Sequence, residues 1–455
     1  MTLDIKTIDD AKKIIKKREI EYVKVGIFDI DGIFRGKYMQ ASKFLHVLDR
    51  GFGYCNVVLG WDSNDKLYEN RGTITGWHTG YSDASVKIVS ETCRELPLEK
   101  NTLLFIGEFD GKFEQACPRG LLKRVIKKAE AMGFKAKMAC EFEFFVFNET
   151  SDTIREKKYQ GLNNLSPGFF GYSMLRASEY HEFYEEMLSL CKTMGFPLEG
   201  LHTETGPGVI EAAICYDDIL ESADQGSLFK TYIKILAKQW NWLATFMAKW
   251  SNDYPGQSGH LHLSLQDLDG KSVFYDSNAK DNISDTMRYF IGGQQALMPE
   301  ILSMVSPTIN SFSRLIPGFW APTDASWGID NRTCALRAIP GSEKSQRVEY
   351  RVTAADINPY IAGAAAFGSG LWGIENQIEP GEPVVGNAYD KKFSQERKFP
   401  GTLNEAALRL EESKAARELF GDVFVEHYAA TRKWESQEYQ RHITDWELKR
   451  YLEII

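Results

Sequence analysis

The stretch CEFEFFVF at residues 140–147 alternates carboxylates with large apolar side chains over its first half. Because successive side chains of a β-strand point to opposite faces of the sheet, Glu141 and Glu143 share one face and Phe142 and Phe144 share the other. The stretch therefore predicts a strand with an acidic face and an apolar face. Taken alone, such a strand most often has a polar face that is simply exposed to water.

Three further stretches place polar side chains on one face in a similar way. GHLHLSL at 259–265 and RVEYRV at 347–352 alternate strictly, and the polar residues on the shared face are His260, His262, Ser264, Arg347, Glu349 and Arg351. HTETGPGVIEAAI at 202–214 is looser and places Glu204 and Glu211 on either side of a Gly-Pro-Gly turn. Carboxylates, histidines and arginines interleaved with apolar residues on several strands fit a sheet that lines a polar tunnel better than a solvated surface.

The charges of these residues indicate a metal and an anion. Five carboxylates that face one cavity raise one another's pKa by repulsion, and divalent cations remove that conflict. Carboxylates with one imidazole are typical ligands of magnesium or manganese rather than zinc. The arginines need anions, of which phosphate and carboxylate are the natural ones. Metal, phosphate and arginine together indicate phosphoryl transfer.

A nucleotide would have to be held without the common phosphate loops. The chain contains neither a GxxxxGK[ST] pattern nor a GxGxxG pattern after a strand. The sequence therefore favours phosphoryl transfer on a scaffold in which metals and arginines hold the phosphates.

The composition is that of a soluble globular protein, with 43% hydrophobic and 26% charged residues among 455. The net charge of −9 gives no support to binding of nucleic acid or of an anionic membrane. The N-terminal segment MTLDIKTIDDAKKIIKK lacks the apolar stretch of a signal peptide, and no segment has the length of a membrane span. Seven scattered cysteines without a CxxC pair argue against a disulfide framework or a structural zinc site. We therefore expect a cytoplasmic protein.

The length of the chain suggests two domains. A helix is expected over 5–18, and the strand-like runs that follow it are 22–30, 55–61, 84–89 and 102–109. Pro118 then precedes a helical stretch, and residues 402–455 are expected to be largely helical. We place the domain boundary just before that proline, which gives domains 1–113 and 114–455.

Eight motifs resemble, in order, those of the glutamine synthetase family. They are FDIDGIFRGK (28–37), CEFEFFVF (140–147), HTETGPGVIEAA (202–213), ATFMAKW (244–250), GQSGHLHLSL (256–265), NSFSRLIPG (310–318), NRTCALR (331–337) and KSQRVEYR (344–351). Any one of these motifs alone would be a weak signal, but the ordered set is a strong one. The resemblance implies an α+β fold with a small N-terminal β-grasp domain and a catalytic domain built on a curved antiparallel sheet. It also implies a dodecamer of two stacked hexamers, with active sites between subunits.

The resemblance further implies two or three magnesium or manganese ions in each active site, with ATP as a co-substrate. The ligands of the metal that meets the substrate are implied to be Glu143, Glu204 and Glu211. The ligands of the metal that meets the ATP phosphates are implied to be Glu141, His260 and Glu349. His262 lies beside these residues and either contacts the nucleotide or supports a ligand.

The other site residues are implied by position in the same motifs. Those expected around the glutamate and the amine are Gly256, His260, Arg314, Trp320 and Arg351. Those expected on the ATP side are Ser264, Lys344 and Arg347. Arg332 and Arg337 match the arginines that neutralise the transferring phosphoryl group.

Two positions depart from the ammonia-using members of the family. Their flap carries Tyr-Glu-Ala-Pro, and its glutamate helps to bind and deprotonate ammonium. Here the stretch NSFSRLIPGFWAPT (310–323) places Trp320 at that position, and an indole cannot accept a proton but can stack on an alkyl group. Those members also use an aspartate from an N-terminal loop of the neighbouring subunit, for which Asp62 in VVLGWDSND (57–65) is the best candidate here.

These departures, with ITDWELKRY at 443–451, resemble the branch that glutamylates organic amines, such as the γ-glutamylpolyamine synthetases. We expect an ATP-dependent ligase that joins the γ-carboxylate of glutamate to a polyamine or another primary amine through a γ-glutamyl phosphate. The first alternative is a glutamine synthetase that uses ammonia. The second is an inactive relative kept as a structural or binding protein, against which the presence of all six implied metal ligands argues.

Overall fold

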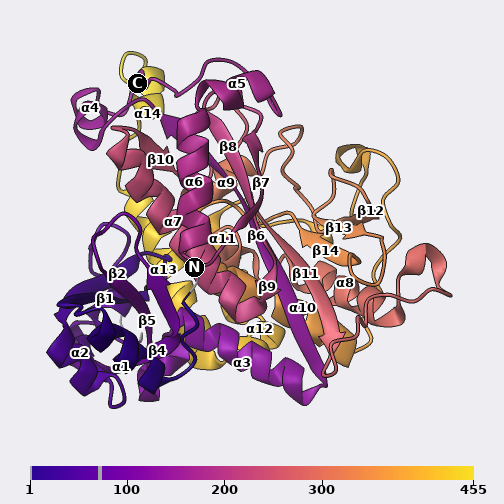
Figure 1. Ribbon diagram of the computed structural model, residues 1–455. Helices are drawn as coiled ribbons and strands as arrows, with labels where there is room; N and C mark the ends of the chain where they lie inside the picture. The colour runs from indigo at the N-terminus through magenta and orange to yellow at the C-terminus, as the bar shows by residue number, and fades with distance from the viewer. Residues whose placement is uncertain (1–2, 70–73) are drawn as a thin grey trace.

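The computed structural model describes residues 3–69 and 74–455 and contains two β-sheets. Figure 1 shows the first sheet at one end of the molecule (indigo, lower left) and the second running through its centre. The first ends at Phe109 and the second begins at Phe134, so the proposed division of the chain at 113/114 falls between them.

The N-terminal sheet has the strand order β2-β1-β5-β4-β3. Strand β1 is parallel to β5, and the other neighbouring pairs of this order are antiparallel. Its elements are α1 (Ile8–Lys17), β1 (Tyr22–Phe28), β2 (Phe34–Gln40), α2 (Ala41–Val47), β3 (Phe52–Cys55), β4 (Asp83–Glu95) and β5 (Leu103–Phe109). Residues of both helices and of the sheet, including Ala11, Phe44 and Phe105, form a small core of their own. A mixed sheet covered by helices agrees with the expected β-grasp domain.

The predicted strand over 55–61 is wrong. β3 ends at Cys55, and Asn56–Leu59 forms a short 3-10 helix whose residues Val58 and Leu59 are buried. A short apolar run carries no periodicity that separates a strand from a buried helical turn, so the sequence alone could not distinguish the two. The strand β2 was not predicted, because its sequence FRGKYMQ is largely polar and mostly solvent-exposed.

The second sheet has the strand order β12-β13-β14-β11-β6-β8-β7, and the short strands β9 and β10 also pair with β6. Its strands are β6 (Phe134–Phe147), β7 (Leu198–Thr203), β8 (Val209–Ile214), β9 (Asp217–Asp218), β10 (Leu243–Thr245), β11 (Gly259–Asp267), β12 (Trp327–Ile329), β13 (Leu336–Ile339) and β14 (Arg347–Tyr350). Every described pairing is antiparallel except that of β12 with β13. The predicted α+β fold with a large antiparallel sheet is therefore confirmed.

The apolar face of this sheet packs on long helices. Phe142 and Phe144 of β6 are fully buried and contact Phe229 of α7 (Ile219–Gln239), with ring centroids 6.1 Å and 6.0 Å apart. Helices α3 (Pro118–Ala131) and α10 (Pro359–Glu375) also contact the sheet. Burying this face leaves the opposite, polar face of the same strands free to form a site.

The remaining helices complete the molecule. They are α4 (Ser151–Glu156), α5 (Met174–Glu179), α6 (His181–Thr193), α8 (Asp285–Leu297), α9 (Ile309–Arg314), α11 (Leu403–Glu412), α12 (Lys414–Phe420), α13 (Asp422–Gln440) and α14 (Asp445–Tyr451). The predicted helical C-terminal segment is confirmed. Helix α13 is tied to the N-terminal domain by the buried Arg432, whose Nη2 lies 2.6 Å from Asp31 Oδ1.

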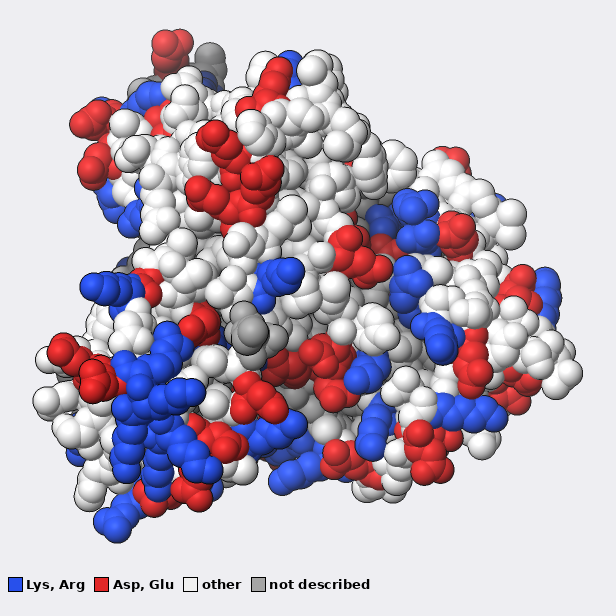
Figure 2. Space-filling model, in the orientation of Figure 1, with Lys and Arg blue, Asp and Glu red and all other residues white. Residues whose placement is uncertain are grey.

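Charged side chains of both signs cover the surface. On the face drawn in Figure 2, Lys and Arg gather over the N-terminal domain and Asp and Glu gather over α6. None of the helices in the described ranges has the length and apolar character needed to cross a membrane.

Candidate active site

The register of the second sheet brings the predicted polar residues to one face. Residues that face each other on neighbouring strands point to the same side of a sheet. The cross-strand partners are Glu141 with His260, His262 with Glu349, and Glu143 with Glu211. The alternation predicted from four separate stretches therefore produces a single polar surface built by β6, β8, β11 and β14.

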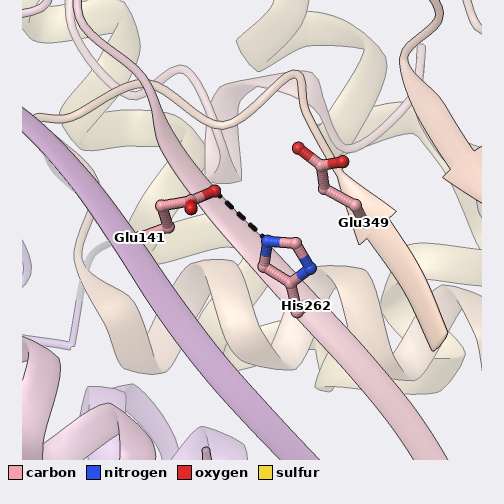
Figure 3. A group of neighbouring side chains, drawn as sticks. All are labelled: Glu141, His262 and Glu349. Carbon is pink, nitrogen blue, oxygen red and sulfur yellow. Dashed lines mark hydrogen bonds and ion pairs between the residues drawn. The ribbon is translucent and has the colours of Figure 1, made fainter. Parts of the chain in front are cut away.

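A first cluster of possible metal ligands lies where β6, β11 and β14 meet. Ligand atoms of Glu141, His262 and Glu349 all lie within 4.8 Å of one another. Figure 3 shows the three side chains converging from these strands. His262 Nε2 is 3.2 Å from Glu141 Oε2, and Arg347 Nε donates to His262 Nδ1 at 3.2 Å. Because Nδ1 accepts a hydrogen bond, Nε2 carries the proton in the neutral ring and donates to Glu141.

His260, the ligand implied by the sequence, borders the same cluster. Its Nδ1 lies 3.5 Å from Glu141 Oε2 and 3.4 Å from Glu349 Oε1, and its buried Nε2 has no hydrogen-bond partner in the structure. Burial and the nearby charge of Arg351 lower the pKa of His260, which favours the neutral imidazole that binds metals. The geometry thus places both His260 and His262 beside the two carboxylates.

Two arginines compensate the buried carboxylate of Glu349. Arg337 Nη1 lies 2.8 Å from Glu349 Oε2, and Arg351 pairs with the other oxygen. Burial alone would raise the pKa of the Glu349 carboxyl, but Arg351, with the neighbouring histidines and Arg337, lowers it to about 2. Glu349 is therefore an anion throughout the physiological pH range, as a metal ligand must be.

A second cluster lies where β6, β7 and β8 meet. Ligand atoms of His202, Glu204 and Glu211 lie within 4.8 Å of one another, and His202 Nε2 is 3.5 Å from each carboxylate. Glu143 faces Glu211 across the strands, and its Oε2 accepts a hydrogen bond from Ser258 N at 2.7 Å. The three carboxylates assigned by sequence to one metal are thus brought together.

His202 is a residue of this cluster that the sequence analysis missed. It stands two residues before Glu204 in the same stretch, so strand periodicity could have placed it on the same face. Burial would lower the pKa of His202, but Glu204 and Glu211 raise it to about 9. Its ring stacks on that of Tyr172, with centroids 4.3 Å apart.

Both clusters fit divalent cations. Burial, with repulsion from Glu143 and Glu141, raises the pKa of Glu211 to about 8, which is the conflict that a bound cation would relieve. Carboxylate oxygens with a few imidazole nitrogens form a donor set suited to hard or borderline cations. The residues could therefore hold metal ions at both clusters.

The residues expected to bind glutamate also lie together. Arg314, at the end of α9, is 2% exposed and donates to the carbonyls of Val352 and Arg351 at 2.9 Å and 3.1 Å. Burial lowers the pKa of Arg314 to about 10, so it keeps its charge at neutral pH. Arg351 is 6% exposed, and its Nε is buried without a hydrogen-bond partner among the described residues. Two buried arginines with unused donors form a suitable site for a carboxylate.

Gly256 packs directly against Arg314. A Cβ at this position would lie 2.6 Å from Arg314 Cγ and 2.7 Å from the backbone oxygen of Ala248, which cannot rotate away. We therefore expect Gly256→Ala to raise the KM for glutamate about 10- to 100-fold, the scale of a small displacement of a binding group. Steady-state kinetics with glutamate and with ATP check this. Gly401→Ala, whose new methyl meets nothing closer than 3.6 Å, should behave as wild type. A normal KM for glutamate in Gly256→Ala would contradict the packing argument.

A cavity of about 770 Å³ opens beside the first cluster. Its lining includes all three residues predicted on the ATP side, together with two members of the cluster: Ser264, Lys344, Arg347, Glu141 and His262. Its volume is in the range of pockets that hold small ligands and cofactors. The cavity therefore joins the predicted nucleotide side to the first cluster.

The two arginines predicted to meet the phosphoryl group differ in their surroundings. Arg337 is held between Asp330 and Glu349 by ion pairs of 2.6 Å and 2.8 Å. Arg332 is exposed at the turn after β12, and no carboxylate of the described ranges pairs with it. Arg332 is thus free to meet an anionic ligand, whereas Arg337 already serves Glu349.

The two residues predicted at the amine end are not part of the metal clusters. Trp320 is 58% exposed in the segment after α9, with a left-handed φ of 60°. Asp62 lies in a loop of the N-terminal domain, where its Oδ1 accepts hydrogen bonds from the backbones of Asn64 and Lys66 at 2.8 Å each. Asp62 therefore stabilises a turn of its own loop in the single chain.

Comparisons with known proteins agree with this geometry. Residues 115–451 match the family model for the glutamine synthetase catalytic domain. Type-1 glutamine synthetase 2 of Dictyostelium discoideum is 45% identical over 448 residues, which cover 97% of this chain and 85% of that protein. Glutamate–isopropylamine ligase of a Pseudomonas species is 38% identical over 455 residues, with 99% of both chains covered. A solved structure described as GmaS without ligand superposes with a TM-score of 0.84 at 24% identity over 97% of this chain and 98% of its own, and so supports the fold.

Proposed function

Because this chain belongs to the glutamine synthetase family, we propose that it is an ATP-dependent ligase that joins the γ-carboxylate of glutamate to an organic amine. The polar face of the second sheet supports the ligase activity, since it combines two possible metal sites, buried arginines and a cavity of nucleotide size. The feature of the chain itself that favours an organic amine is Trp320, which stands where ammonia-using members of the family carry a glutamate.

The residues divide the proposed reaction between them. Bound divalent cations at the two clusters would screen the charges of the phosphates and of the glutamate carboxylate. Arg314 and Arg351 hold glutamate, and the cavity beside Ser264 holds ATP. Arg332 and Arg337 stabilise the charge of the transferring phosphoryl group.

Two bond changes follow in order. The glutamate γ-carboxylate oxygen attacks the γ-phosphorus of ATP, the bond to ADP breaks, and a γ-glutamyl phosphate forms. The lone pair of the amine nitrogen then attacks the acyl carbon, the carbon–oxygen bond to phosphate breaks, and the γ-glutamyl amide and phosphate are released. The amine gives up one proton in this step.

The amine must lose a proton to expose the attacking lone pair, and Trp320 cannot accept that proton. A simple protonated amine has a pKa of about 10.4, so removing its proton at pH 7 costs about 4–5 kcal/mol. Ammonia-using relatives offset this cost with carboxylates around the ammonium. An indole offers none, but its exposed apolar face can cover the alkyl group of an organic amine at about 25 cal/mol per Å² buried. The relative named for isopropylamine is similar over its full length, which supports an alkylamine as the acceptor.

The second candidate function is glutamine synthetase itself, with ammonia as the acceptor. The relative from Dictyostelium discoideum, named a type-1 glutamine synthetase, favours this candidate by its identity to the chain. The discriminating experiment is phosphate release in the presence of glutamate and ATP with a panel of acceptors: ammonium, methylamine, isopropylamine, ethanolamine and putrescine. An organic amine with the highest kcat/KM supports the proposal, and ammonium as the best acceptor restores glutamine synthetase.

Replacing Trp320 tests the role of the indole. If the ring covers about 60 Å² of the alkyl group, Trp320→Ala should lower kcat/KM for the preferred organic amine about tenfold, because about 1.5 kcal/mol of burial is lost. The value for ammonium, which has no apolar surface, should change little. Trp446→Ala, which removes an indole of similar exposure (60%) on α14, is the matched control. Equal losses for ammonium and the organic amine would show that Trp320 only supports the flap.

Assembly and metal content form part of the same proposal. We propose two or three magnesium or manganese ions in each active site and a dodecamer of stacked hexamers with sites between subunits. Asp62 lies in a loop of the N-terminal domain outside both metal clusters, which fits a site that a neighbouring subunit completes. A mass of twelve chains by light scattering is expected, and a monomer with full activity would rule out shared sites.

A further inference from the structure

Lys249 carries a buried ammonium that has no carboxylate partner among the described residues. Its side chain belongs to the segment between β10 and β11 and is 4% exposed. Nζ donates to the carbonyl oxygen of Tyr254 at 2.7 Å and lies 4.8 Å from the centre of the Phe319 ring. No Asp or Glu in residues 3–69 and 74–455 forms an ion pair with it.

This arrangement leaves the charge of Lys249 incompletely compensated. A buried charge is expensive unless an opposite charge or several hydrogen bonds compensate it. Some partly buried lysines of the chain have such a carboxylate partner, such as Lys24 with Glu99 and Lys157 with Glu149. Burial lowers the pKa of Lys249, and no carboxylate in the described part of the chain raises it again. A bound anion would supply the opposite charge that the Lys249 ammonium lacks.

Backbone hydrogen bonds connect Lys249 to the residues assigned to glutamate. Its backbone exchanges two hydrogen bonds of 2.7 Å with the Asn310 side chain in α9, the helix that ends at Arg314. The carbonyl of the preceding residue, Ala248, accepts from Gln257 N at 2.7 Å and lies against Gly256. The backbone around Lys249 is therefore in contact with the segments that carry Gly256 and Arg314, the two residues assigned to glutamate.

The residues that contact the Lys249 ammonium also stand next to residues assigned to the substrates. Tyr254, whose carbonyl it bonds, stands two residues before Gly256. Phe319, whose ring covers it, stands beside Trp320 in the flap. The buried Lys230 also donates to a carbonyl, that of Ile357, but its aromatic neighbours Phe142 and Phe246 belong to the core behind the sheet.

We propose that Lys249 is a glutamate-binding residue, whose ammonium pairs with the α-carboxylate of the substrate while Arg314 and Arg351 hold the same molecule. This inference rests on the proposed function, since it assumes glutamate as the acyl substrate. The α-carboxylate is the one not consumed by the reaction, so a permanent salt bridge to it orients glutamate without hindering phosphoryl transfer. Phe319 then closes over the pair from the flap, which links glutamate binding to the position of Trp320.

The test compares glutamate with 4-aminobutyrate, which is glutamate without its α-carboxylate. Dissociation constants are measured by calorimetry in the presence of magnesium and a non-hydrolysable ATP analogue, for wild type and for Lys249→Met. We expect Lys249→Met to weaken glutamate about tenfold or more, the scale of a lost charged hydrogen bond. The affinity for 4-aminobutyrate should stay within about twofold, because the carboxylate that the lysine meets is already missing.

Two controls separate a binding role from a structural one. Lys249→Arg keeps the charge and should recover part of the glutamate affinity. Lys112→Met removes a lysine that lies at the same 4.8 Å from an aromatic ring, that of Phe113, and should leave both affinities unchanged. An equal loss for glutamate and 4-aminobutyrate in Lys249→Met, or no loss for either, would overturn the inference. If the wild type itself does not bind glutamate, the proposed function fails instead.

Discussion

Replacing Glu349 with glutamine is expected to reduce turnover about 10³-fold, equivalent to about 4 kcal/mol of transition-state stabilisation, the scale of a metal's contribution to charge stabilisation. Glutamine keeps the shape of the side chain but removes the charge that faces His260 at 3.4 Å and two arginines. Manganese affinity, measured by calorimetry, should fall together with kcat. Glu349→Ala should abolish turnover while the fold is largely retained.

The contrast with a surface pair makes this result specific. Glu379→Gln also removes a carboxylate from an arginine, Arg288, but at an exposed position, and should leave turnover and metal affinity unchanged. Excess chelator should abolish wild-type activity, and added magnesium or manganese should restore it. Full activity in chelator, or a Glu349→Gln variant with more than a tenth of wild-type turnover, would contradict the assignment of Glu349 to a metal site.

Arg351→Ala is expected to lower kcat/KM for glutamate by about 2–4 kcal/mol, which is about 30- to 1,000-fold. The buried Nε of Arg351 has no partner within the described chain and is available for a carboxylate. Its backbone oxygen, which accepts from Arg314 at 3.1 Å, is kept in the variant. The loss should therefore come from the guanidinium and not from displacement of Arg314.

The diagnostic result for Arg351→Ala is a change in the kinetics with glutamate without a matching change in the KM for ATP. The KM for ATP should change less than about threefold, because the nucleotide cavity is lined by other residues. Arg351→Lys should recover little, since a single ammonium cannot replace the planar fork of donors. ATP hydrolysis that proceeds equally well without glutamate would show that glutamate is not the substrate.

The strand alternation was the most informative part of the sequence. Each of Glu141, His260 and Glu349 was placed on a polar face from its own strand, and the register of β6, β11 and β14 brought those faces together as predicted. This worked because side-chain direction in a strand is fixed by a period of two residues, whatever the neighbouring strand is. The eight ordered motifs then identified the family, which the match over 115–451 supports independently.

Features that depend on packing between distant segments could not be predicted in this way. The apolar run after Cys55 forms a 3-10 helix whose Val58 and Leu59 belong to the large core shared with distant segments. The separation of Lys249 from the carboxylates of the described residues is also invisible in the sequence, since it depends on which loops surround the ammonium. His202, by contrast, could have been found from its spacing to Glu204.

The two residues predicted at the amine end lie outside both metal clusters. Trp320 is exposed in the flap, and Asp62 is bound to its own loop in another domain. A direct measurement of acceptor preference therefore tests the proposed function at this end of the site.

A competition experiment measures the preference between ammonium and an organic amine most directly. The enzyme is given glutamate, ATP and magnesium with ammonium and isopropylamine at equal total concentrations, and both amides are quantified by mass spectrometry early in the reaction. Their ratio equals the ratio of the two kcat/KM values, free of errors in enzyme concentration. Our account predicts that γ-glutamylisopropylamide exceeds glutamine, and that the excess shrinks in Trp320→Ala. An excess of glutamine, repeated when methylamine, ethanolamine or putrescine replaces isopropylamine, would contradict it.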